Sequence, residues 1–466
     1  MNWIVISDIH IGGDTSLDIF RSQTQLADFL KSLNQGPLTL IINGDFIDFL
    51  AVEPFGSFSR DAAKKKILKI VEAPPNVDVW KAFRAFLAAS EHQNHIDILL
   101  GNHDVELVFE EVQTALKVVM AEPEDRDRIR FLTDRLSYPR LVVGGVHFHV
   151  EHGFQYDPFN WYDHNKLIQA TQFGQDGSKF ELPVGSDIVY IVLNKLTPQH
   201  PYMPLLKPEA AAFWMLAALA PREIFKHGGR ALVIGSGTVK AVLKRFLRGV
   251  QLGSGPDPIK GLTPVQLQLA EMLDEDLTDD TVEDLEEFLD LGTGDEKPST
   301  GITFASSPVL RGKLFFVRRA LKSLKYKRDS FFDPTKRDEF NSALDSILEQ
   351  GAKVAIFGHS HAQKMLFLLK EEQDWSADPL LLKAPSLVYL NTGTWANLLD
   401  FDLAVLSNDE AAQAWLDDLE AGRVEATLIY TYARLEELSS GQGARVSLEQ
   451  WRDGEPHVVN SVEVAP

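Results

Sequence analysis

Six short apolar runs recur along this sequence, and each one is followed directly by glycine or by a polar or charged side chain. Helix-like segments, such as residues 17–33 and 79–87, lie between the first runs. Alternation of this kind predicts an α/β fold in which the runs are strands. Ligands bind at the carboxyl ends of strands in open α/β sheets, so the side chains that follow the runs are candidate site residues. The runs are residues 3–7, 38–43, 96–100, 141–150, 354–357 and 387–390, of which 141–150 is either one strand or two strands that turn at Gly144 and Gly145.

The composition excludes several classes of protein. The chain has 466 residues, which suits one large domain with a substantial insertion or two to three smaller domains. It has no cysteine, so a disulfide framework, thiolate chemistry and cysteine–zinc sites are excluded. Its net charge of −21 disfavours a protein that coats nucleic acid, because a surplus of carboxylates repels polyanions.

The N-terminus and the apolar runs predict a cytoplasmic, soluble protein. Met1 is followed directly by a strand-like run rather than by the pattern of a signal peptide. No apolar run reaches the roughly 20 residues that a membrane span needs. The longest candidate, residues 210–220, stops at Pro221.

The strand rhythm breaks in the middle of the chain. We therefore expect residues 1–160 to form the first part of a core, 161–350 to form a largely helical insertion or lid, and 351–466 to complete the core. The insertion carries eleven acidic residues in the block 271–290 and eight basic residues in the segment 311–328. After the sixth run, the pattern predicts a helix near 410–419 and strands at 426–435 and 444–451.

Five short motifs appear in order, each at the end of a predicted strand. They are Asp8-Ile9-His10, Gly44-Asp45-Phe46-Ile47-Asp48, Gly101-Asn102-His103-Asp104, His152-Gly153 and Gly358-His359-Ser360-His361. Together they resemble the calcineurin-like metallophosphoesterase superfamily. The bacterial UDP-2,3-diacylglucosamine pyrophosphohydrolases are distantly similar, because they also carry a lid between the fourth and fifth motifs. The resemblance implies a four-layer α/β/β/α sandwich with metal ions at the strand ends.

The motifs contain the side chains that a two-metal phosphoesterase needs. Two metal ions about 3.5–4 Å apart clamp the phosphate and turn a bridging water into a hydroxide nucleophile. The resemblance implies that Asp45 bridges the two ions. It assigns Asp8, His10 and His361 to the first ion, and Asn102, His152 and His359 to the second. Oxygen and imidazole ligands without sulfur favour Mn²⁺, and iron or zinc also fits.

Two further residues of the motifs receive catalytic roles from the same resemblance. His103 would face the leaving group as a general acid or as a stabiliser of the transition state. Asp48 would hydrogen-bond this histidine and fix its tautomer. Two departures from related families stand out. Phe49 replaces the arginine of the protein phosphatases, and His103 stands where the diacylglucosamine hydrolases usually carry arginine.

Other residues near the motifs have open or structural interpretations. We expect Asp104 to be a helix N-cap, and His147 and His149 to be structural. Two groups stay open between a role in the site and a structural role. The first is the segment 391–395, which is either a substrate-positioning segment or a strand-ending turn. The second comprises Tyr156, Asp157 and Asn160, which follow the fourth motif and could line the pocket. The basic segment 311–328 is open between a solvated helix paired with the acidic block, an attractor for a polyphosphate, and a helix on an anionic membrane surface.

The sequence therefore predicts a metal-dependent phosphoester hydrolase that uses a bridging hydroxide on a phosphodiester, nucleotide or pyrophosphate bond. The expected partner is a small phosphorylated substrate. The alternatives are a lipid-linked pyrophosphate hydrolase at the membrane surface, a nuclease, which the net charge disfavours, and a scaffold without activity. Peripheral membrane contact and the oligomeric state stay open.

Overall fold

The computed structural model describes most of the chain outside the expected insertion. The described residues are 2–33, 36–89, 93–157, 160–206, 215, 314–315, 317–318, 321, 338–369, 375–377, 385–399, 401 and 403–466. The acidic block 271–290 and most of the basic segment 311–328 lie outside them. The chain divides into two compact units, of which unit 1 comprises Met1–Ser186, Arg328–Leu398 and Ala426–Pro466, and unit 2 comprises Asp187–Lys327 and Leu399–Glu425.

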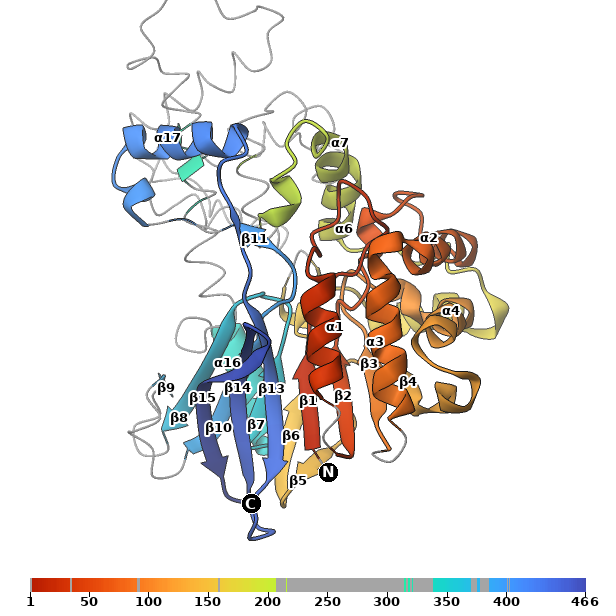
Figure 1. The fold of residues 1–466 in the computed structure, drawn as a ribbon, viewed down its shortest axis with the longest axis vertical. Coiled ribbons are helices and arrows are strands. Elements are labelled where there is room, and N and C mark those ends of the chain that lie inside the picture. The colour runs from red at the N-terminus through yellow and green to blue at the C-terminus, as the bar shows by residue number, and fades with distance from the viewer. Residues whose placement is uncertain are drawn as a thin grey trace, which may run out of the picture. The chain divides into compact units, whose positions relative to one another are not determined.

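Unit 1 contains a seven-stranded sheet built from both ends of the chain (Figure 1). Its strands, in spatial order, are β15 (Glu455–Val464), β14 (Ala444–Arg452), β13 (Tyr430–Glu437), β1 (Asn2–Ile6), β2 (Leu38–Asn43), β3 (His95–Leu99) and β4 (Ile129–Leu132). Strands β1 to β4 are parallel, and the C-terminal strands β13, β14 and β15 add to them in antiparallel pairs. All six residues of β2 are buried, as expected for a central parallel strand covered on both faces.

A second sheet of six strands also belongs to unit 1. Its order is β5 (Leu141–Val143), β6 (Val146–Val150), β7 (Val354–Phe357), β10 (Pro385–Thr392), β8 (Gln363–Leu369) and β9 (Trp375–Ser376). Strands β6, β7 and β10 are parallel, whereas the outer pairs are antiparallel. The run 141–150, expected as one strand or two, forms two strands joined by a turn at Gly144 and Gly145. Two further short strands, β11 (Leu398–Leu399) and β12 (Ala426–Thr427), pair with each other.

Helices cover both outer faces of the sheets. The helices of unit 1 are α1 (Gln23–Ser32), α2 (Arg60–Glu72), α3 (Val77–Ala88), α4 (Glu110–Met120), α5 (His164–Thr171) and α16 (Asp338–Glu349). Helices α1 to α4 pack on the seven-stranded sheet around a core that includes Phe29, Phe83 and Leu116. Helix α16 packs on the six-stranded sheet through Leu344 and Ile347.

A separate apolar cluster fills the space between the two sheets. It joins Val5 and Ile41 of the first sheet to Val150 and Ile356 of the second. Because strand side chains alternate between faces, each sheet uses one face for this cluster and the other for its helices. The expected α/β/β/α sandwich is therefore confirmed.

Unit 2 is described only in part. Its described helices include a π-helical turn at Val189–Leu193, α7 (Asn194–Leu196) and two 3₁₀ helices, η9 (Met203–Leu205) and η14 (Leu403–Leu406). They also include α17 (Asp409–Glu420), which confirms the helix expected near 410–419. Helix α6 (Val184–Ile188) spans the boundary between the units along the chain. Residues 161–186 and 338–350 of the expected insertion fall in unit 1. The largely helical insertion stays a prediction, because most of it lies outside the described residues. No helix among the described residues is both long and apolar enough to cross a membrane.

Candidate metal centre

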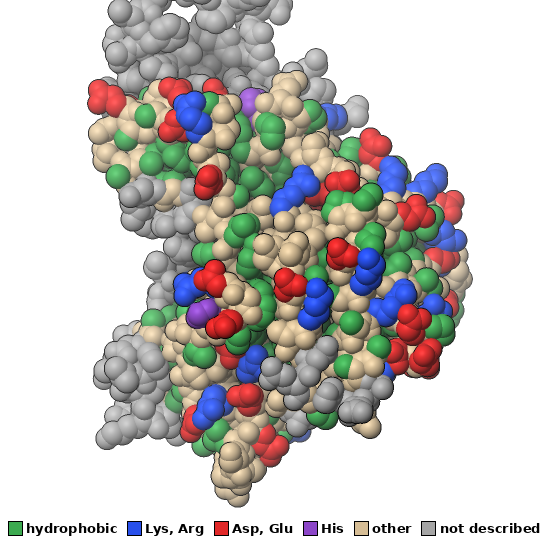
Figure 2. Space-filling view, viewed as in Figure 1, with side chains coloured by type: hydrophobic (Ala, Val, Ile, Leu, Met, Phe, Trp, Pro, Cys, Tyr) green, Lys and Arg blue, Asp and Glu red, His purple; other side chains and the backbone are tan. Residues whose placement is uncertain are grey.

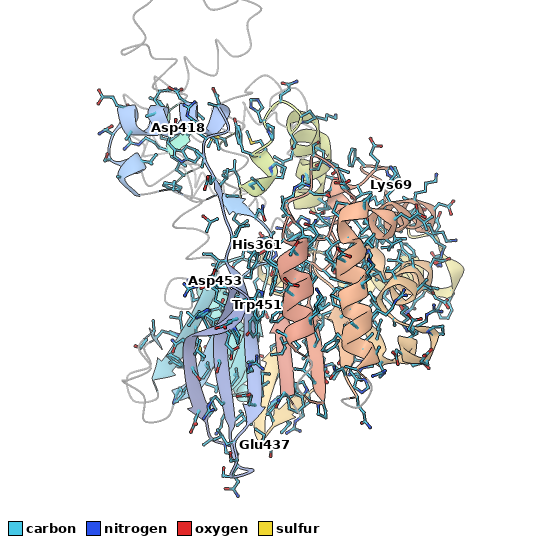
Figure 3. All side chains as sticks on the ribbon, in the orientation of Figure 1. Lys69, His361, Asp418, Glu437, Trp451 and Asp453 are labelled. Atoms are coloured by element: carbon cyan, nitrogen blue, oxygen red, sulfur yellow. The ribbon has the colours of Figure 1, made fainter. Side chains whose placement is uncertain are left out.

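The seven predicted ligands and the predicted general acid His103 come together at the carboxyl ends of parallel strands in both sheets of unit 1. Asp8 and His10 follow β1, Asp45 follows β2, Asn102 and His103 follow β3, His152 follows β6, and His359 and His361 follow β7. All eight are buried. Figure 3 shows His361 at the end of the strands opposite to Glu437, the last residue of β13. The sandwich thus brings together side chains that are up to about 350 residues apart in the sequence.

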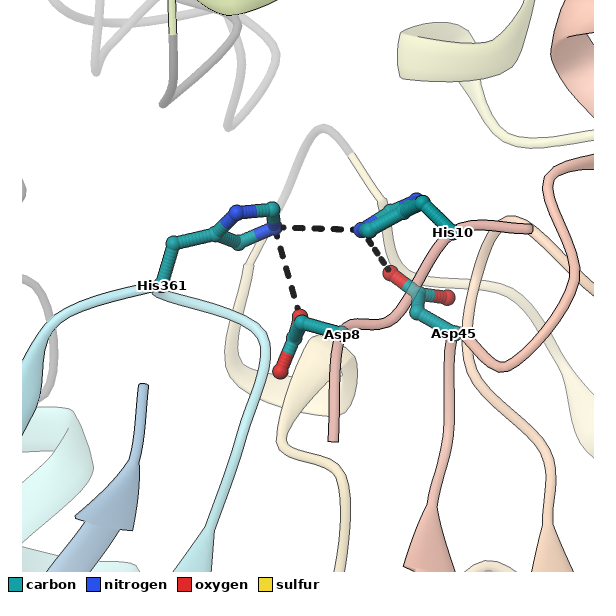
Figure 4. Close-up of side chains that lie close together, drawn as sticks. All are labelled: Asp8, His10, Asp45 and His361. Atoms are coloured by element: carbon teal, nitrogen blue, oxygen red, sulfur yellow. Dashed lines mark hydrogen bonds and ion pairs between the residues drawn. The ribbon is translucent and has the colours of Figure 1, made fainter. Parts of the chain in front are cut away.

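Four of these residues form one cluster, drawn in Figure 4. Imidazole nitrogen Nε2 of His361 lies 3.3 Å from Nε2 of His10 and 3.3 Å from Oδ1 of Asp8. His10 Nε2 in turn lies 3.6 Å from Oδ2 of Asp45. One ligand atom from each of the four residues falls within 4.8 Å of the others. These are the residues predicted for the first metal ion.

A second cluster shares Asp45 with the first. Nε2 of His152 lies 3.3 Å from Asp45 Oδ2, the same oxygen that faces His10. Ligand atoms of Asp45, His152 and His359 lie within 4.8 Å of one another. The amide oxygen of Asn102 is buried and has no hydrogen-bond partner among the described residues. One carboxylate oxygen between two groups of ligands is the arrangement expected for a bridging residue.

His103 lies beside the first cluster and contacts Asp48. Its Nδ1 lies 3.1 Å from Asp48 Oδ1, and its ring meets the ring of His10 edge-on at 4.6 Å between centroids. The backbone N–H of His103 donates to Asp45 Oδ1 at 2.8 Å. Asp48 also caps the 3₁₀ helix η1 (Phe49–Ala51), because Oδ1 accepts from two backbone N–H groups at its start. His103 is thus held by its backbone to Asp45 and by its ring to Asp48.

Unusual backbone conformations mark the same residues. Five of the seven predicted ligands have a positive φ: Asp8 (53°), His10 (58°), Asp45 (51°), His359 (67°) and His361 (60°). Non-glycine residues rarely adopt this region, and such strain concentrates at functional sites. The strain supports the interpretation that these side chains are aimed at a common centre.

Two of the motif glycines permit close approach of the ligand loops. Gly44 has a φ of 81°, and a Cβ atom there would lie 2.5 Å from the ring of His152. A Cβ atom at Gly101 would overlap Oδ1 of Asp45. Any side chain at either position would therefore displace a predicted ligand.

The electrostatics of the site favour bound cations. Burial raises the pKa of Asp8, and the nearby carboxylate of Asp45 raises it further. Burial also acts to raise the pKa of Asp45, but attraction to His152 and His103 outweighs it and lowers that pKa well below its usual value. The pKa of His152 is raised to about 9, because attraction to Asp45 and Asp8 outweighs its burial. Buried carboxylates that raise the pKa of a neighbouring imidazole mark a site of negative potential.

The residues present fit a pair of divalent cations. The donor set consists of carboxylate, amide and imidazole groups, which suit divalent first-row metals. The unpartnered oxygen of Asn102 and the two facing imidazole nitrogens of His10 and His361 would each gain a partner from a cation. The arrangement can therefore hold metal ions, although the assignment of each ligand to the first or second ion stays a prediction.

Asp104 differs from its expected role. It stands directly before the 3₁₀ helix η4 (Val105–Val108), but its carboxylate does not cap that helix. It accepts hydrogen bonds from the backbone N–H of Phe46 at 2.8 Å and of Gly101 at 2.6 Å. Burial and Asp45 raise its pKa to about 7. Asp104 thus ties the second motif to the third.

The segment Asn391–Trp395 lies behind the site. Its asparagine side chain donates to Gly358 O at 2.7 Å. The Thr394 hydroxyl and the backbone N–H of Trp395 both donate to the backbone carbonyl of Asp8, at 2.7 and 3.0 Å. These contacts support the interpretation of a turn that holds the loops carrying Asp8 and His359.

One contact of the site has no counterpart in the five motifs. Oδ2 of Asp157 lies 3.0 Å from Nε2 of His359, and both side chains are buried. The sequence left Asp157 undecided as a pocket residue, and no motif spacing signalled its partner. By contrast, His149 lies 3.2 Å from Glu151 and is absent from the metal-binding groups found among the described residues, in line with a structural role.

Comparison with known proteins agrees with this geometry. Residues 1–209 match the family model described as calcineurin-like phosphoesterase. The matched span holds the first four motifs, and the sandwich brings the fifth, Gly358–His361, to the same strand ends. No match to this chain was found among curated proteins. Residues 1–209 are therefore similar to the calcineurin-like phosphoesterases, and this match indicates a hydrolase that acts on phosphoric ester bonds.

Proposed function

We propose that this protein hydrolyses a phosphodiester, nucleotide or pyrophosphate bond in a small substrate, and that it uses two divalent cations, with Mn²⁺ as the first candidate. The observation that carries the proposal is the position of Asp45. Its Oδ2 lies between His10, at 3.6 Å, and His152, at 3.3 Å, so two groups of ligands share one carboxylate oxygen. A single-metal site has no need of a shared carboxylate.

Seven residues would hold the two cations. Asp8, His10 and His361 would serve the first, Asn102, His152 and His359 the second, and Asp45 both. When bound, the cations supply positive charge to the phosphoryl oxygens and a water that loses its proton near neutral pH. The burial of all seven side chains supports this role, because ligand groups that are shielded from water keep a fixed geometry.

His103 and Asp48 would act on the leaving group. The N–H at Nδ1 of His103 donates to Asp48 Oδ1, so the other nitrogen, Nε2, is the one that can hold or transfer a proton. His103 is held at its backbone by Asp45, the shared carboxylate, so its ring is anchored to the centre where the phosphate would bind. Protonation of a leaving oxygen by such a group is worth about 10²–10⁴-fold in rate.

The charge distribution supports a small substrate rather than nucleic acid. The chain carries a net charge of −21. On the face drawn in Figure 2, acidic and basic side chains are interspersed over α2, α3 and α4 and do not form a basic stripe there. A nucleic-acid groove needs clustered lysine and arginine side chains that follow the phosphate backbone.

The described residues of the basic segment do not favour a membrane-bound substrate. Leu314, Val317 and Leu321 recur at helical spacing and are buried. Arg318 pairs with Asp409 of α17 at 2.8 Å. An amphipathic helix on a membrane must present its apolar face to the lipid, and in this segment these three apolar side chains are already covered.

The proposal can be tested on metal-stripped protein. Hydrolysis of bis-p-nitrophenyl phosphate and p-nitrophenyl phosphate would be measured with and without added Mn²⁺, for the wild type, Asp45→Asn and Asp163→Asn. Asp163 caps α5 through its side chain, and asparagine caps helices equally well, so Asp163→Asn is a matched control for the change of one carboxylate to an amide.

We expect Mn²⁺-dependent cleavage of the diester by the wild type and by Asp163→Asn, and none by Asp45→Asn. Full activity in Asp45→Asn would overturn the assignment of the shared carboxylate. Wild-type protein that binds Mn²⁺ but cleaves neither substrate, nor a nucleotide pyrophosphate offered beside them, would overturn the proposed reaction and favour a scaffold.

A further inference from the structure

We propose that Asp157, which lies outside the five motifs, is a positioning residue that orients the ring of His359 towards the second cation. The inference rests on the proposed two-metal site. It concerns a carboxylate that would hold a metal ligand in place rather than bind the metal itself.

The contact between the two residues is short and shielded from water. Asp157 Oδ2 lies 3.0 Å from His359 Nε2, and the two residues are 5% and 8% exposed. An imidazole N–H donates to a carboxylate, so this contact places the proton of His359 on Nε2. The lone pair that can bind a metal is then on Nδ1.

His361, two residues further along, uses the opposite ring nitrogen. Its Nε2 lies 3.3 Å from both Asp8 Oδ1 and His10 Nε2, so this atom faces the first cluster. The two histidines of the fifth motif would therefore bind different cations through different nitrogens. A histidine that binds through Nδ1 needs a partner at Nε2 to select this tautomer, and Asp157 supplies it.

Asp157 is itself held in place by hydrogen bonds of its own. Its Oδ2 accepts a hydrogen bond from the side-chain amide of Asn160 at 2.7 Å. Its backbone N–H donates to Phe154 O at 3.0 Å, and its carbonyl accepts from Asn160 N and Trp161 N at 3.0 and 2.8 Å. These bonds fix the turn in which the carboxylate sits.

The placement of this turn couples the two ligand loops of the six-stranded sheet. The loop after β6 carries the ligand His152 and, five residues later, Asp157. The loop after β7 carries His359. One loop therefore contributes a ligand of its own and also orients the ligand of its neighbour. Carboxylates in this position typically change metal affinity by about 10–100-fold when they are removed.

The test is a calorimetric titration of metal-stripped protein with Mn²⁺. It would compare the wild type with Asp157→Ala, Asp157→Asn, His359→Ala and the control Asp163→Asn. We expect Asp157→Ala to weaken one of the two binding steps by about 10–100-fold and to leave the other unchanged. Asp157→Asn keeps an oxygen acceptor, so its Mn²⁺ affinity should fall less than that of Asp157→Ala. The Mn²⁺ affinity of Asp163→Asn should equal that of the wild type.

The site that weakens identifies the role of Asp157. It should be the one lost in His359→Ala, and the double variant Asp157→Ala/His359→Ala should bind no more weakly than His359→Ala alone. The inference is overturned if both steps are unchanged in Asp157→Ala, or if both weaken equally as in a general loss of structure. Wild-type protein that shows fewer than two binding steps would instead overturn the two-metal function itself.

Discussion

Replacement of Asp48 by alanine gives the sharpest prediction about the leaving-group side of the site. The carboxylate accepts from His103 Nδ1 at 3.1 Å inside the protein, where both residues are buried. A hydrogen bond to a charged group contributes about 1.5–3 kcal/mol. If this energy orients His103 in the transition state, Asp48→Ala should lower kcat by about 10- to 160-fold.

The size of the effect should depend on the leaving group. p-Nitrophenolate departs readily without a proton, whereas unsubstituted phenolate needs one. The loss in Asp48→Ala and in His103→Ala should therefore be larger for diphenyl phosphate than for bis-p-nitrophenyl phosphate. His103→Ala should lose about 10²–10⁴-fold on the poorer leaving group.

A double-mutant cycle separates this role from a structural one. Asp48 also caps η1, so Asp48→Ala should lower the free energy of unfolding by about 0.5–2 kcal/mol. On activity, the loss that Asp48→Ala causes through His103 should be absent in the double variant. Asp48 Oδ2 also lies 3.6 Å from Nδ1 of the predicted ligand His10, so a Mn²⁺ titration of Asp48→Ala separates a loss of bound cation from the loss at His103. Additive losses in the double variant, or equal losses on both substrates, would show that Asp48 does not act on the leaving group through His103.

Three further predictions concern the stability of the site and its surroundings. Gly44→Ala should cost about 1–2 kcal/mol for its left-handed backbone and should also weaken metal binding, because the new Cβ displaces His152; melting and metal titration would check both. Lys66→Met should cost about 3–5 kcal/mol in urea unfolding, since it leaves Glu106 charged and buried without its 2.9 Å partner, and Lys66→Met/Glu106→Gln should recover part of the loss. Removal of cations with EDTA should lower the melting temperature, because each cation at 100 times its Kd stabilises the folded state by about 2.7 kcal/mol.

These predictions would be contradicted by specific results. Gly44→Ala that binds Mn²⁺ as the wild type does would show that the His152 loop can move without cost. An unchanged free energy of unfolding in Lys66→Met would mean that Glu106 becomes hydrated or protonated in the variant. A melting temperature that is the same with and without EDTA would contradict the binding of cations to the folded state.

Much of the fold could be predicted from the sequence because several central strands are mostly apolar and are followed by glycine, as β2 is by Gly44 and β7 by Gly358. β2 and β7 match the predicted runs at both ends. Strand β15 was missed for the opposite reason. It is an edge strand with most of its side chains exposed or half-buried, so its sequence lacks both an apolar run and a clean alternation. Helix α2 was missed because three consecutive lysines, residues 64–66, obscure its apolar face, and one of them is buried in an ion pair.

The candidate site was predictable only as far as its motifs reach. The ligands could be named because the five motifs resemble those of the metallophosphoesterases. Parallel strands bring the strand ends that carry these motifs together. The contacts that hold them could not be named, since they join distant loops by tertiary packing alone. Asp157 and His359 are 202 residues apart, and the bonds of Asp104 to Phe46 and Gly101 depend on how two loops meet. The roles of the individual ligands and of His103 stay predictions.

The position of bound metal tests the proposed two-metal site most directly. Crystals of the protein grown with Mn²⁺ would be measured for anomalous scattering at the manganese edge. A two-metal site should give two peaks about 3.5–4 Å apart on either side of Asp45. One peak should lie beside Asp8, His10 and His361, and the other beside Asn102, His152 and His359. A single peak, or two peaks that do not share Asp45, would contradict the proposed two-metal site.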